Sequence, residues 1–237
     1  MNILITGGAS GLGAAITKKL ADDHTHTVYF TYFKSTEHAK QMSRVFPNIQ
    51  SVYCDFQNLD EVEALAAKIV EMDLDVLINN AITGITINHF NKLPLQTFHI
   101  GFMNNLLPTI RIAQQAILTF RKKKSGKIIT ILSSLMKKSP LVGLSCYLAE
   151  KAYLESLTRS WAIENRKFNI TSISIFPSFM ETNLTRNIDE RIIEEIRNER
   201  STKRLLRPEE VADTVNALLL AKDEFGEDRN YKEMVLR

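Results

Sequence analysis

The chain has 237 residues, 44% of them hydrophobic and 24% charged, with a formal net charge of +3 at pH 7. This length suits one α/β domain with a substantial core and leaves no room for a second independent domain. The nearly balanced charge gives no indication of a nucleic-acid or membrane partner. Only Cys54 and Cys146 are present, so we expect no disulfide framework. No apolar stretch approaches the roughly 20 residues of a membrane helix, and no charged-then-apolar leader precedes the first strand. We therefore expect a cytoplasmic protein.

Short apolar runs alternate with amphipathic helical runs along the whole chain. The pattern predicts strands near residues 2–6, 27–32, 50–54, 75–79, 127–132, 170–176 and 232–236. It predicts helices near residues 12–22, 36–45, 58–71, 96–123, 147–166 and 208–221. Because the strands are apolar almost throughout, we expect a seven-stranded parallel sheet with helices on both faces, forming a single doubly wound α/β domain of Rossmann type over residues 1–237.

A glycine-rich turn, GGASGLG, links the first predicted strand to the first helix. Gly7 allows a sharp turn at the strand end, Gly11 leaves space for a phosphate beside backbone N–H groups, and Gly13 lets the helix pack closely on the strand. The N-terminus of the helix, with its free N–H groups, would then face a pyrophosphate. The spacing differs from the common G-x-G-x-x-G pattern, so the prediction of a dinucleotide site depends on the strand–turn–helix context.

The second predicted strand, TVYFTY, indicates which dinucleotide binds. NAD-binding domains usually place a carboxylate at the end of this strand, where it holds the ribose 2′-hydroxyl. Here Phe33, Lys34 and Ser35 follow the strand, so no carboxylate repels a 2′-phosphate and Lys34 supplies a cation. We therefore expect NADP(H) in preference to NAD(H). The alternative is that Lys34 is an ordinary solvated lysine.

Three side chains further along the chain predict acid–base chemistry. Tyr147 and Lys151 stand four residues apart, so a helix places them on one face, and Ser134 lies thirteen residues before Tyr147. An ammonium near the phenol would lower its pKa from about 10 toward the working pH of a general acid, and the serine hydroxyl would hold the substrate oxygen. A Tyr-x-x-x-Lys pair also occurs on ordinary amphipathic helices, so this prediction depends on the glycine turn upstream.

The segment 183–206 departs from the alternation of strands and helices. It is charged, lacks long apolar runs and comes just after a predicted strand. Ligands of open α/β sheets bind beyond the carboxyl ends of the strands. The segment is therefore expected to be either a lid over the ligand or a solvated surface helix.

Together these motifs resemble the short-chain dehydrogenase/reductase family over essentially the whole chain. The residues that carry the resemblance are 6–13 (TGGASGLG), Asp55, 79–81 (NNA), Asn105, Ser134, Tyr147, Lys151 and 177–182. Within the family the likeness is greatest to 3-oxoacyl-[acyl-carrier-protein] reductases, because residues 122–133 and 207–212 read much like their counterparts there.

The resemblance implies a dinucleotide-binding half over about residues 1–95. The residues expected to contact the dinucleotide are Thr6, Gly7, Ser10, Gly11, Leu12, Gly13, Lys34, Asp55, Asn79, Asn80, Ala81, Tyr147, Lys151, Pro177 and Thr182. In this set Asp55 would accept a hydrogen bond from the adenine amine, and it is also suited to capping the following helix. Thr182 would contact the nicotinamide carboxamide.

The resemblance places the catalytic and substrate half at about residues 96–237, with Asn105, Ser134, Tyr147 and Lys151 as its catalytic residues. Tyr147 would donate a proton to the substrate oxygen while hydride reaches the carbonyl carbon, and Ser134 would orient that oxygen. Lys151 would lower the tyrosine pKa and grip the ribose, and Asn105 would hold a water in the proton relay. The residues that follow favour Asn105 over its neighbour Asn104, and the thirteen-residue spacing favours Ser134 over Ser133.

We therefore expect an NADP(H)-dependent enzyme that reduces a carbonyl to a secondary alcohol, as the 3-oxoacyl-thioester reductases do. One alternative is a dehydrogenase or reductase of a sugar or another small secondary alcohol. A second is a non-catalytic dinucleotide-binding sensor, against which the complete set of four catalytic residues argues. The five histidines have no ligand spacing, so no metal site is expected.

The resemblance also implies protein partners. The predicted helices 96–123 and 147–166 would pair with their copies in a homodimer or homotetramer. An acyl carrier protein would dock at the positions of Lys124 and Phe168, next to Arg166 and Lys167. The alternative is that the basic run 121–124 only complements the C-terminus of a helix.

Overall fold

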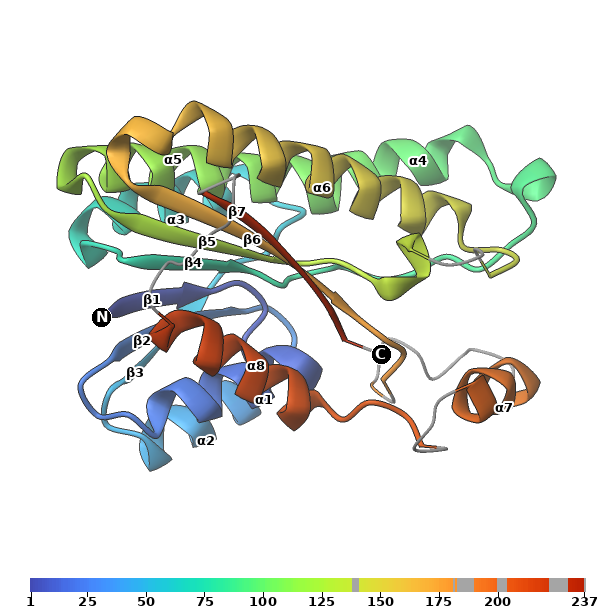
Figure 1. The fold of residues 1–237 in the computed structure, drawn as a ribbon, viewed down its shortest axis with the longest axis horizontal. Coiled ribbons are helices and arrows are strands. Elements are labelled where there is room, and N and C mark those ends of the chain that lie inside the picture. Colours follow the sequence, from blue (N-terminus) through green and yellow to red (C-terminus); the bar gives the residue numbers. More distant parts are fainter. Residues whose placement is uncertain (138–140, 181, 183–189, 200–203, 222–229, 237) are drawn as a thin grey trace.

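Seven parallel strands form one sheet in the order β3-β2-β1-β4-β5-β6-β7 (Figure 1). The computed structural model describes residues 1–137, 141–180, 182, 190–199, 204–221 and 230–236. The strands are β1 Asn2–Ile5, β2 Thr27–Tyr32, β3 Ile49–Tyr53, β4 Val76–Asn79, β5 Gly126–Ile131, β6 Ile170–Pro177 and β7 Tyr231–Leu236. Every predicted strand is confirmed, and each end lies within one residue of its predicted position.

Helices cover both faces of this sheet, as the sequence predicts (Figure 1). One face carries α1 (Gly11–Ala21), α2 (Thr36–Val45) and α8 (Pro208–Leu220), and the other carries α3 (Leu59–Met72), α5 (Leu107–Lys123) and α6 (Ser145–Glu164). The short helix α4 (Leu95–Gly101) leads into α5. Within the predicted lid segment, α7 (Glu190–Glu199) lies beyond the sheet, and residues 183–189 and 200–203 fall outside the described ranges.

The single α-helix predicted over 96–123 is wrong in one respect. A π-helical turn over Phe102–Leu106 interrupts it between α4 and α5. Such turns insert an extra residue into the helical ladder and occur often at functional sites. In the described part of the chain, no helix is both long enough and apolar enough to cross a membrane.

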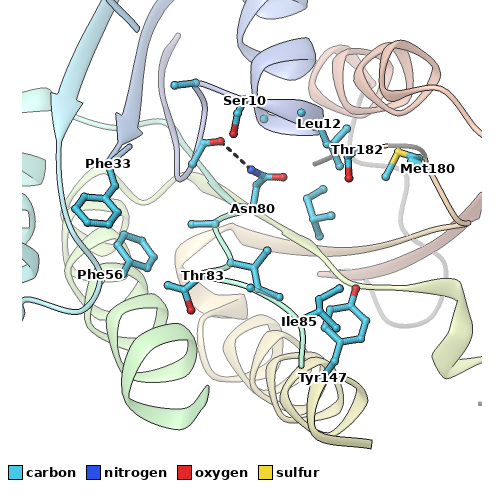
Figure 2. A pocket seen from close by; sticks show the side chains of 18 of the residues that line it. Ser10, Leu12, Phe33, Phe56, Asn80, Thr83, Ile85, Tyr147, Met180 and Thr182 are labelled. Carbon is cyan, nitrogen blue, oxygen red and sulfur yellow. Dashed lines mark hydrogen bonds between the residues drawn. The ribbon is translucent and has the colours of Figure 1, made fainter. Parts of the chain in front are cut away.

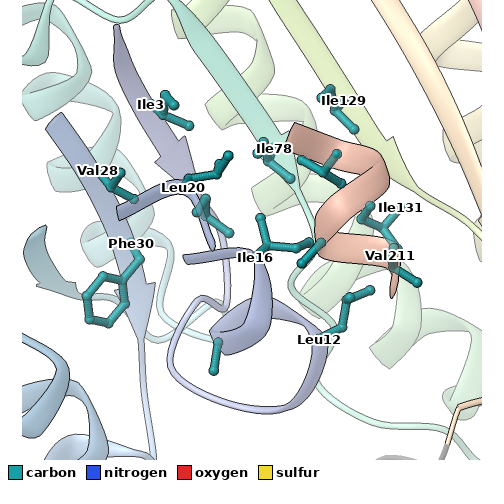
Figure 3. Packing of buried hydrophobic residues seen from close by; sticks show 14 of the residues in the cluster. Ile3, Leu12, Ile16, Leu20, Val28, Phe30, Ile78, Ile129, Ile131 and Val211 are labelled. Atoms are coloured by element: carbon teal, nitrogen blue, oxygen red, sulfur yellow. The ribbon is translucent and has the colours of Figure 1, made fainter. Parts of the chain in front are cut away.

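Two apolar cores lie on the two faces of the sheet because alternate residues of a strand point in opposite directions. Ile3, Ile78 and Ile129 belong to the core under α1 and α8, whereas the adjacent Leu4 and Leu77 belong to the core under α3 and α5. Figure 3 shows the first core, with Ile16 and Leu20 of α1 and Val211 of α8 directed at the strands. Burial on both faces explains why these strands are almost uniformly apolar.

The strand order reverses between β1 and β4, from which the chain winds outward in both directions. In open α/β sheets this reversal leaves a crevice at the carboxyl ends of the strands. Thr6, directly after β1, joins the two central strand ends: its Oγ1 accepts hydrogen bonds from the backbone N–H groups of Asn80 and Ala81, each at 3.0 Å. The fold thereby fixes the loops that line the crevice.

Candidate active site

A cavity of about 620 Å³ occupies the crevice at the carboxyl ends of the strands. Figure 2 shows Phe33 and Phe56 at one end of the cavity and Tyr147 at the other, with Ser10 and Leu12 of the glycine turn between them. The residues that the sequence predicts for the cofactor and for acid–base chemistry are thus brought to one continuous wall, with the exceptions described below.

The glycine turn and the N-terminus of α1 line the cavity. Gly7 and Gly11 adopt left-handed backbone conformations, with φ of +68° and +50°, which L-residues with a Cβ rarely adopt. α1 begins at Gly11, and the side chain of its N-cap residue Ser10 makes no capping hydrogen bond. A Cβ at Gly11 would meet the Thr182 side chain at an ordinary contact distance of 3.7 Å, so the turn lies directly beside Thr182 on the cavity wall. These features fit a diphosphate at the N-terminus of α1.

Gly13 serves a different purpose from Gly11. A Cβ at this position would clash with the backbone carbonyl of Gly7 and would lie 2.7 Å from Nδ2 of Asn80. Asn80 donates from Nδ2 to the carbonyl oxygens of Thr6 (2.9 Å) and Gly7 (3.3 Å). Gly13 therefore allows the first turn of α1 to pack against the loop that Asn80 holds.

The end of the cavity near β2 and β3 combines aromatic rings, a cation and a carboxylate. Phe33, Lys34, Asp55 and Phe56 line it, and the ammonium of the exposed Lys34 lies 5.6 Å from the centre of the Phe33 ring. Oδ1 of Asp55 accepts a hydrogen bond from the backbone N–H of Gln57 at 2.9 Å. The alternative that Asp55 caps the following helix is wrong, because Asn58 is the N-cap of α3.

Two residues predicted to contact the dinucleotide lie behind the cavity wall. Thr6 and Asn79 are only 1% and 4% exposed, and neither is among the described residues that line the cavity. Thr6 instead holds the loop after β4 through the hydrogen bonds given above. The neighbouring Asn80 and Ala81 do line the cavity, as do Pro177, the last residue of β6, and Thr182 beyond it.

Ser133, and not Ser134, faces the cavity near Tyr147. The chain remains extended beyond β5 through Ser133, with φ of −153° and ψ of 137°, and Ser133 lines the cavity together with Tyr147 and Lys151. A 3-10 turn begins at Ser134 and carries that residue away, leaving it 4% exposed. The position predicted for Ser134 is therefore wrong, because the turn begins at Ser134 itself, one residue earlier than the predicted position requires.

Burial dominates the protonation of Tyr147 and Lys151. It raises the pKa of Tyr147 to about 12, while the neighbouring Ser133 hydroxyl acts in the opposite direction. It lowers the pKa of Lys151 to about 8. The Lys151 ammonium donates a hydrogen bond to the carbonyl oxygen of Ile131 at 2.8 Å and lies 5.8 Å from the centre of the Tyr147 ring. The pKa of Tyr147 therefore lies above its ordinary value, where the sequence predicted a lowered one, because burial favours the neutral form of each group.

Asn105 lies in the π-helical turn and borders a second cavity of about 250 Å³, whose wall also includes Tyr147. The side chain is 6% exposed, and both of its amide heteroatoms are hydrogen-bonded. Its Oδ1 accepts hydrogen bonds from the backbone N–H and the hydroxyl of Thr83, both at 2.8 Å. Its Nδ2 donates to Oε2 of Glu150 at 2.8 Å. The structure thus brings Asn105 and Tyr147 to the wall of one cavity.

Comparison with known proteins decides the family of this chain. The family model described as short chain dehydrogenase matches residues 1–192. The chain belongs to the short-chain dehydrogenase family.

Individual relatives of this short-chain dehydrogenase agree with that assignment. The 3-oxoacyl-[acyl-carrier-protein] reductase MabA of Mycobacterium tuberculosis (strain ATCC 25618 / H37Rv) is 30% identical over 220 residues, which cover 92% of this chain and 84% of the relative. A chloroplastic tropinone reductase homologue of Arabidopsis thaliana is 27% identical over 232 residues, covering 93% and 70%. A solved short chain dehydrogenase/reductase family protein superposes with a TM-score of 0.83 at 27% identity, covering 99% of this chain and 94% of that chain.

As a short-chain dehydrogenase, the protein is an oxidoreductase that acts on a carbonyl or an alcohol with a nicotinamide dinucleotide. The likeness to 3-oxoacyl-[acyl-carrier-protein] reductases predicted from sequence is confirmed. The left-handed turn at Gly11 and the N-terminus of α1, both on the cavity wall, fit the diphosphate of such a cofactor. No group of three or more His, Cys, Asp or Glu side chains within the described ranges could hold a metal ion.

Sequence reasoning missed three residues of the short-chain dehydrogenase site. Phe56 lines the main cavity, Thr83 holds Asn105, and Glu150 borders the second cavity. A signal was present for Glu150, since a carboxylate directly before Lys151 on a helix lies close to the proposed acid. No signal linked Thr83 to Asn105, because the contact depends on how the loop after β4 folds.

Proposed function

We propose that this short-chain dehydrogenase is an NADP(H)-dependent reductase that converts the carbonyl of a 3-oxoacyl thioester to a secondary alcohol. The observation that carries the proposal is a single cavity with Lys34 at one end and Ser133, Tyr147 and Lys151 at the other. A dinucleotide in this cavity would have its phosphorylated ribose beside Lys34 and its reacting end beside the acid–base group.

The preference for NADP(H) rests on charge at the end of β2. The residues that follow this strand are Phe33, Lys34 and Ser35, with no carboxylate to repel a 2′-phosphate. The ammonium of Lys34 is exposed and borders the cavity. A cation so placed favours the phosphorylated ribose over the plain 2′-hydroxyl.

The acid–base step follows from the protonation of the buried groups. When bound, the dinucleotide supplies the hydride. Tyr147 keeps its proton at neutral pH because its pKa is raised to about 12, so it can donate that proton to the carbonyl oxygen as negative charge develops there. Ser133 donates a hydrogen bond to the same oxygen and orients it. Lys151, with a pKa lowered to about 8, stabilises the resulting phenolate and exchanges protons at little cost near neutral pH.

The thioester substrate is supported by relatives and by one surface. MabA and FabG, named as 3-oxoacyl-[acyl-carrier-protein] reductases, are among the relatives. At the C-terminal ends of α5 and α6, Arg121 and Lys167 lie 5.0 and 5.2 Å from the centre of the Phe168 ring, and the exposed Lys124 is linked through its carbonyl to Asn169. This basic and aromatic surface suits an acidic carrier protein.

The carrier surface also bears on assembly. It lies beside the amino ends of β5 and β6, which begin at Gly126 and Ile170, whereas the cavity lies at the carboxyl ends of the strands. A carrier bound there would deliver its acyl group to the cavity of another subunit. Delivery of the acyl group from a docked carrier therefore requires a homo-oligomer of this chain.

A turnover screen tests the proposed function. NADPH consumption would be followed with a 3-oxoacyl thioester, a keto-sugar, a quinone and a small cyclic amino ketone, and the thioester would be offered both on acyl carrier protein and as a free pantetheine derivative. We expect kcat/KM to be at least tenfold higher for the thioester, and higher again on the carrier. A preference for the small ketone would favour the second candidate, to which the tropinone reductase homologue points. NADPH binding without turnover of any substrate would refute both.

A further inference from the structure

Glu150 places a carboxylate beside the proposed catalytic residues. It lies on α6, three residues after Tyr147 and directly before Lys151. Its side chain borders the second cavity of about 250 Å³, together with Asn105, Cys146 and Tyr147. Nothing in the acid–base scheme described above uses this carboxylate.

The two oxygens of Glu150 have different neighbours. Oε2 accepts the hydrogen bond from Nδ2 of Asn105 at 2.8 Å, and Oε1 lies 3.5 Å from Sγ of Cys146. Because Thr83 donates two hydrogen bonds to Oδ1 of Asn105, Glu150 and Thr83 together clamp the amide from both ends. These contacts hold the Asn105 amide in one orientation, with Oδ1 toward Thr83 and Nδ2 toward Glu150.

Gly101 provides the space that Glu150 occupies. A Cβ at position 101 would clash with Oε1 of Glu150. Gly101 is the last residue of α4 and directly precedes the π-helical turn that carries Asn105. The glycine, the π-helical turn and the carboxylate therefore form one structural unit, assembled from residues 101–106 and from α6.

We propose that Glu150 is a positioning residue of this enzyme: it fixes the amide of Asn105 and keeps a negative charge beside Tyr147 and Lys151. The inference rests on the proposed function for its kinetic consequences, and on the observed contacts for its structural ones. A hydrogen bond from a neutral amide to a carboxylate is stronger than one between neutral groups. The negative charge of Glu150 therefore strengthens the hydrogen bond that positions Asn105.

The charge of Glu150 has a defined direction of effect on its neighbours. The Cys146 thiol lies 3.5 Å from Oε1, the Tyr147 phenol borders the same cavity, and Lys151, which feels the charge, is the next residue of α6. The residues that α4, the π-helical turn and the loop after β4 contribute to this cavity are all neutral: Thr83, Gly84, Ile85, Thr86, Thr97, Ile100, Gly101 and Asn105. The carboxylate raises the pKa of Tyr147 and opposes the lowering of the Lys151 pKa by burial. It therefore keeps the phenol protonated to higher pH, which a donor in carbonyl reduction needs.

Three variants separate the charge from the hydrogen bond. Glu150→Gln keeps an acceptor for Nδ2 of Asn105 and removes the charge, so the basic limb of kcat/KM for reduction should move to lower pH, by roughly half to one and a half units. Glu150→Ala loses both, and kcat should fall about tenfold or more at every pH. Gly101→Ala displaces the carboxylate without removing it, so kcat should fall while the KM for NADPH changes less than twofold.

The matched control is Glu164→Gln, which removes a carboxylate from an exposed position at the end of the same helix. With a free thioester substrate this variant should reproduce both the rate and the pH profile of the wild type. An unshifted basic limb in Glu150→Gln, or a kcat within twofold of wild type in Glu150→Ala, would overturn the proposal.

A titration that does not depend on turnover completes the test. With ¹³C-labelled tyrosine, NMR can follow the Tyr147 phenol directly, its signal assigned by its absence in Tyr147→Phe. The apparent pKa should be lower in Glu150→Gln than in the wild type, and an equal value would contradict the proposal. If the wild-type enzyme reduces none of the carbonyls in the screen, the proposed function fails, and this titration alone decides the role of Glu150.

Discussion

Tyr147 and Lys151 are both buried, and burial favours the neutral form of each side chain. For Tyr147 the neutral form is the proton donor that a reductase needs. For Lys151 it means that a charged ammonium in this position costs folding free energy. The two residues therefore differ in how they affect stability and activity, and substitutions can separate the two effects.

Lys151→Met should stabilise the protein at neutral pH while abolishing turnover. The pKa of Lys151 in the folded state is about 8, below its usual value of 10.5, so below pH 8 folding carries the full cost of burying the charge, on the order of 3 kcal/mol. As pH rises from 8 to 10.5 the folded state loses its proton first, and this cost disappears. The gain in unfolding free energy, measured with denaturant, should thus be largest below pH 8 and vanish above pH 10.5. A constant gain across this range would contradict the assignment.

Tyr147→Phe removes only the phenolic hydroxyl. NADPH binding should be retained, and turnover should fall by roughly 10²–10⁴, the contribution of a general acid. Stopped-flow kinetics and NADPH fluorescence titration measure the two quantities separately. Turnover equal to that of the wild type would exclude Tyr147 as the proton donor.

The two adjacent serines provide a matched pair. Ser133→Ala removes the hydroxyl that borders the cavity near Tyr147 and should lower kcat by roughly 10², as loss of one donor to a developing oxyanion does. Ser134→Ala changes a residue outside the cavity wall and should leave kcat within about twofold. The reverse ranking in steady-state assays would restore the prediction made from the sequence spacing.

These residues show what sequence spacing can and cannot supply. Helical periodicity correctly placed Tyr147 and Lys151 on one wall, because four residues span about one turn of a helix. Ser134 was misplaced because the loop before α6 has no fixed period, and the backbone turns at an unpredictable residue. The contact between Asn105 and Glu150 joins positions 45 residues apart and depends on the packing of α6 against the π-helical turn.

At the level of elements, the strands were predictable because burial on both faces leaves a continuous apolar signal in the sequence. The π-helical turn at Phe102–Leu106 was not, since an inserted residue leaves the amphipathic pattern on either side largely intact. A mid-helix asparagine was the visible sign of that irregularity. The structure adds the reason for it, which is that the turn brings Asn105 between Thr83 and Glu150.

The preference for NADP(H) over NAD(H) is predicted to depend on Lys34, in the loop between β2 and α2. Lys34→Ala should weaken NADPH binding by about 1.5–3 kcal/mol, the range for a hydrogen bond to a charged group, and leave NADH binding nearly unchanged. Lys40→Ala is the control, because Lys40 is an exposed lysine of α2 that pairs with Glu37 at 3.0 Å. Calorimetric titration of both dinucleotides gives the comparison. Equal losses for NADPH and NADH, or tighter binding of NADH by the wild type, would remove the basis for NADP(H) specificity.

At the scale of the whole molecule, the outer surface of α4, the π-helical turn, α5 and α6 is unusually apolar. The exposed fractions are 48% for Ile100, 51% for Leu118, 44% for Tyr153 and 75% for Ile163. The Phe102 ring, 37% exposed, packs edge to face against Tyr153, with ring centres 6.0 Å apart. Leu106 of the π-helical turn and Trp161 of α6 are only 4% and 8% exposed and belong to the core instead.

We predict that this surface pairs with its copy, giving at least a homodimer. A two-fold interface brings the same patch from each subunit together, and burying the exposed Leu, Ile and aromatic side chains would supply the driving force. Light scattering at micromolar concentration should give about twice the chain mass of 27.0 kDa for a dimer, or about four times that mass for a tetramer. Tyr153→Glu, which places a charge beside the Phe102 ring, should shift the mass toward that of one chain, whereas Glu164→Gln should not. A wild-type mass of one chain would contradict the prediction and would also remove the route by which a docked carrier reaches the cavity of a second subunit.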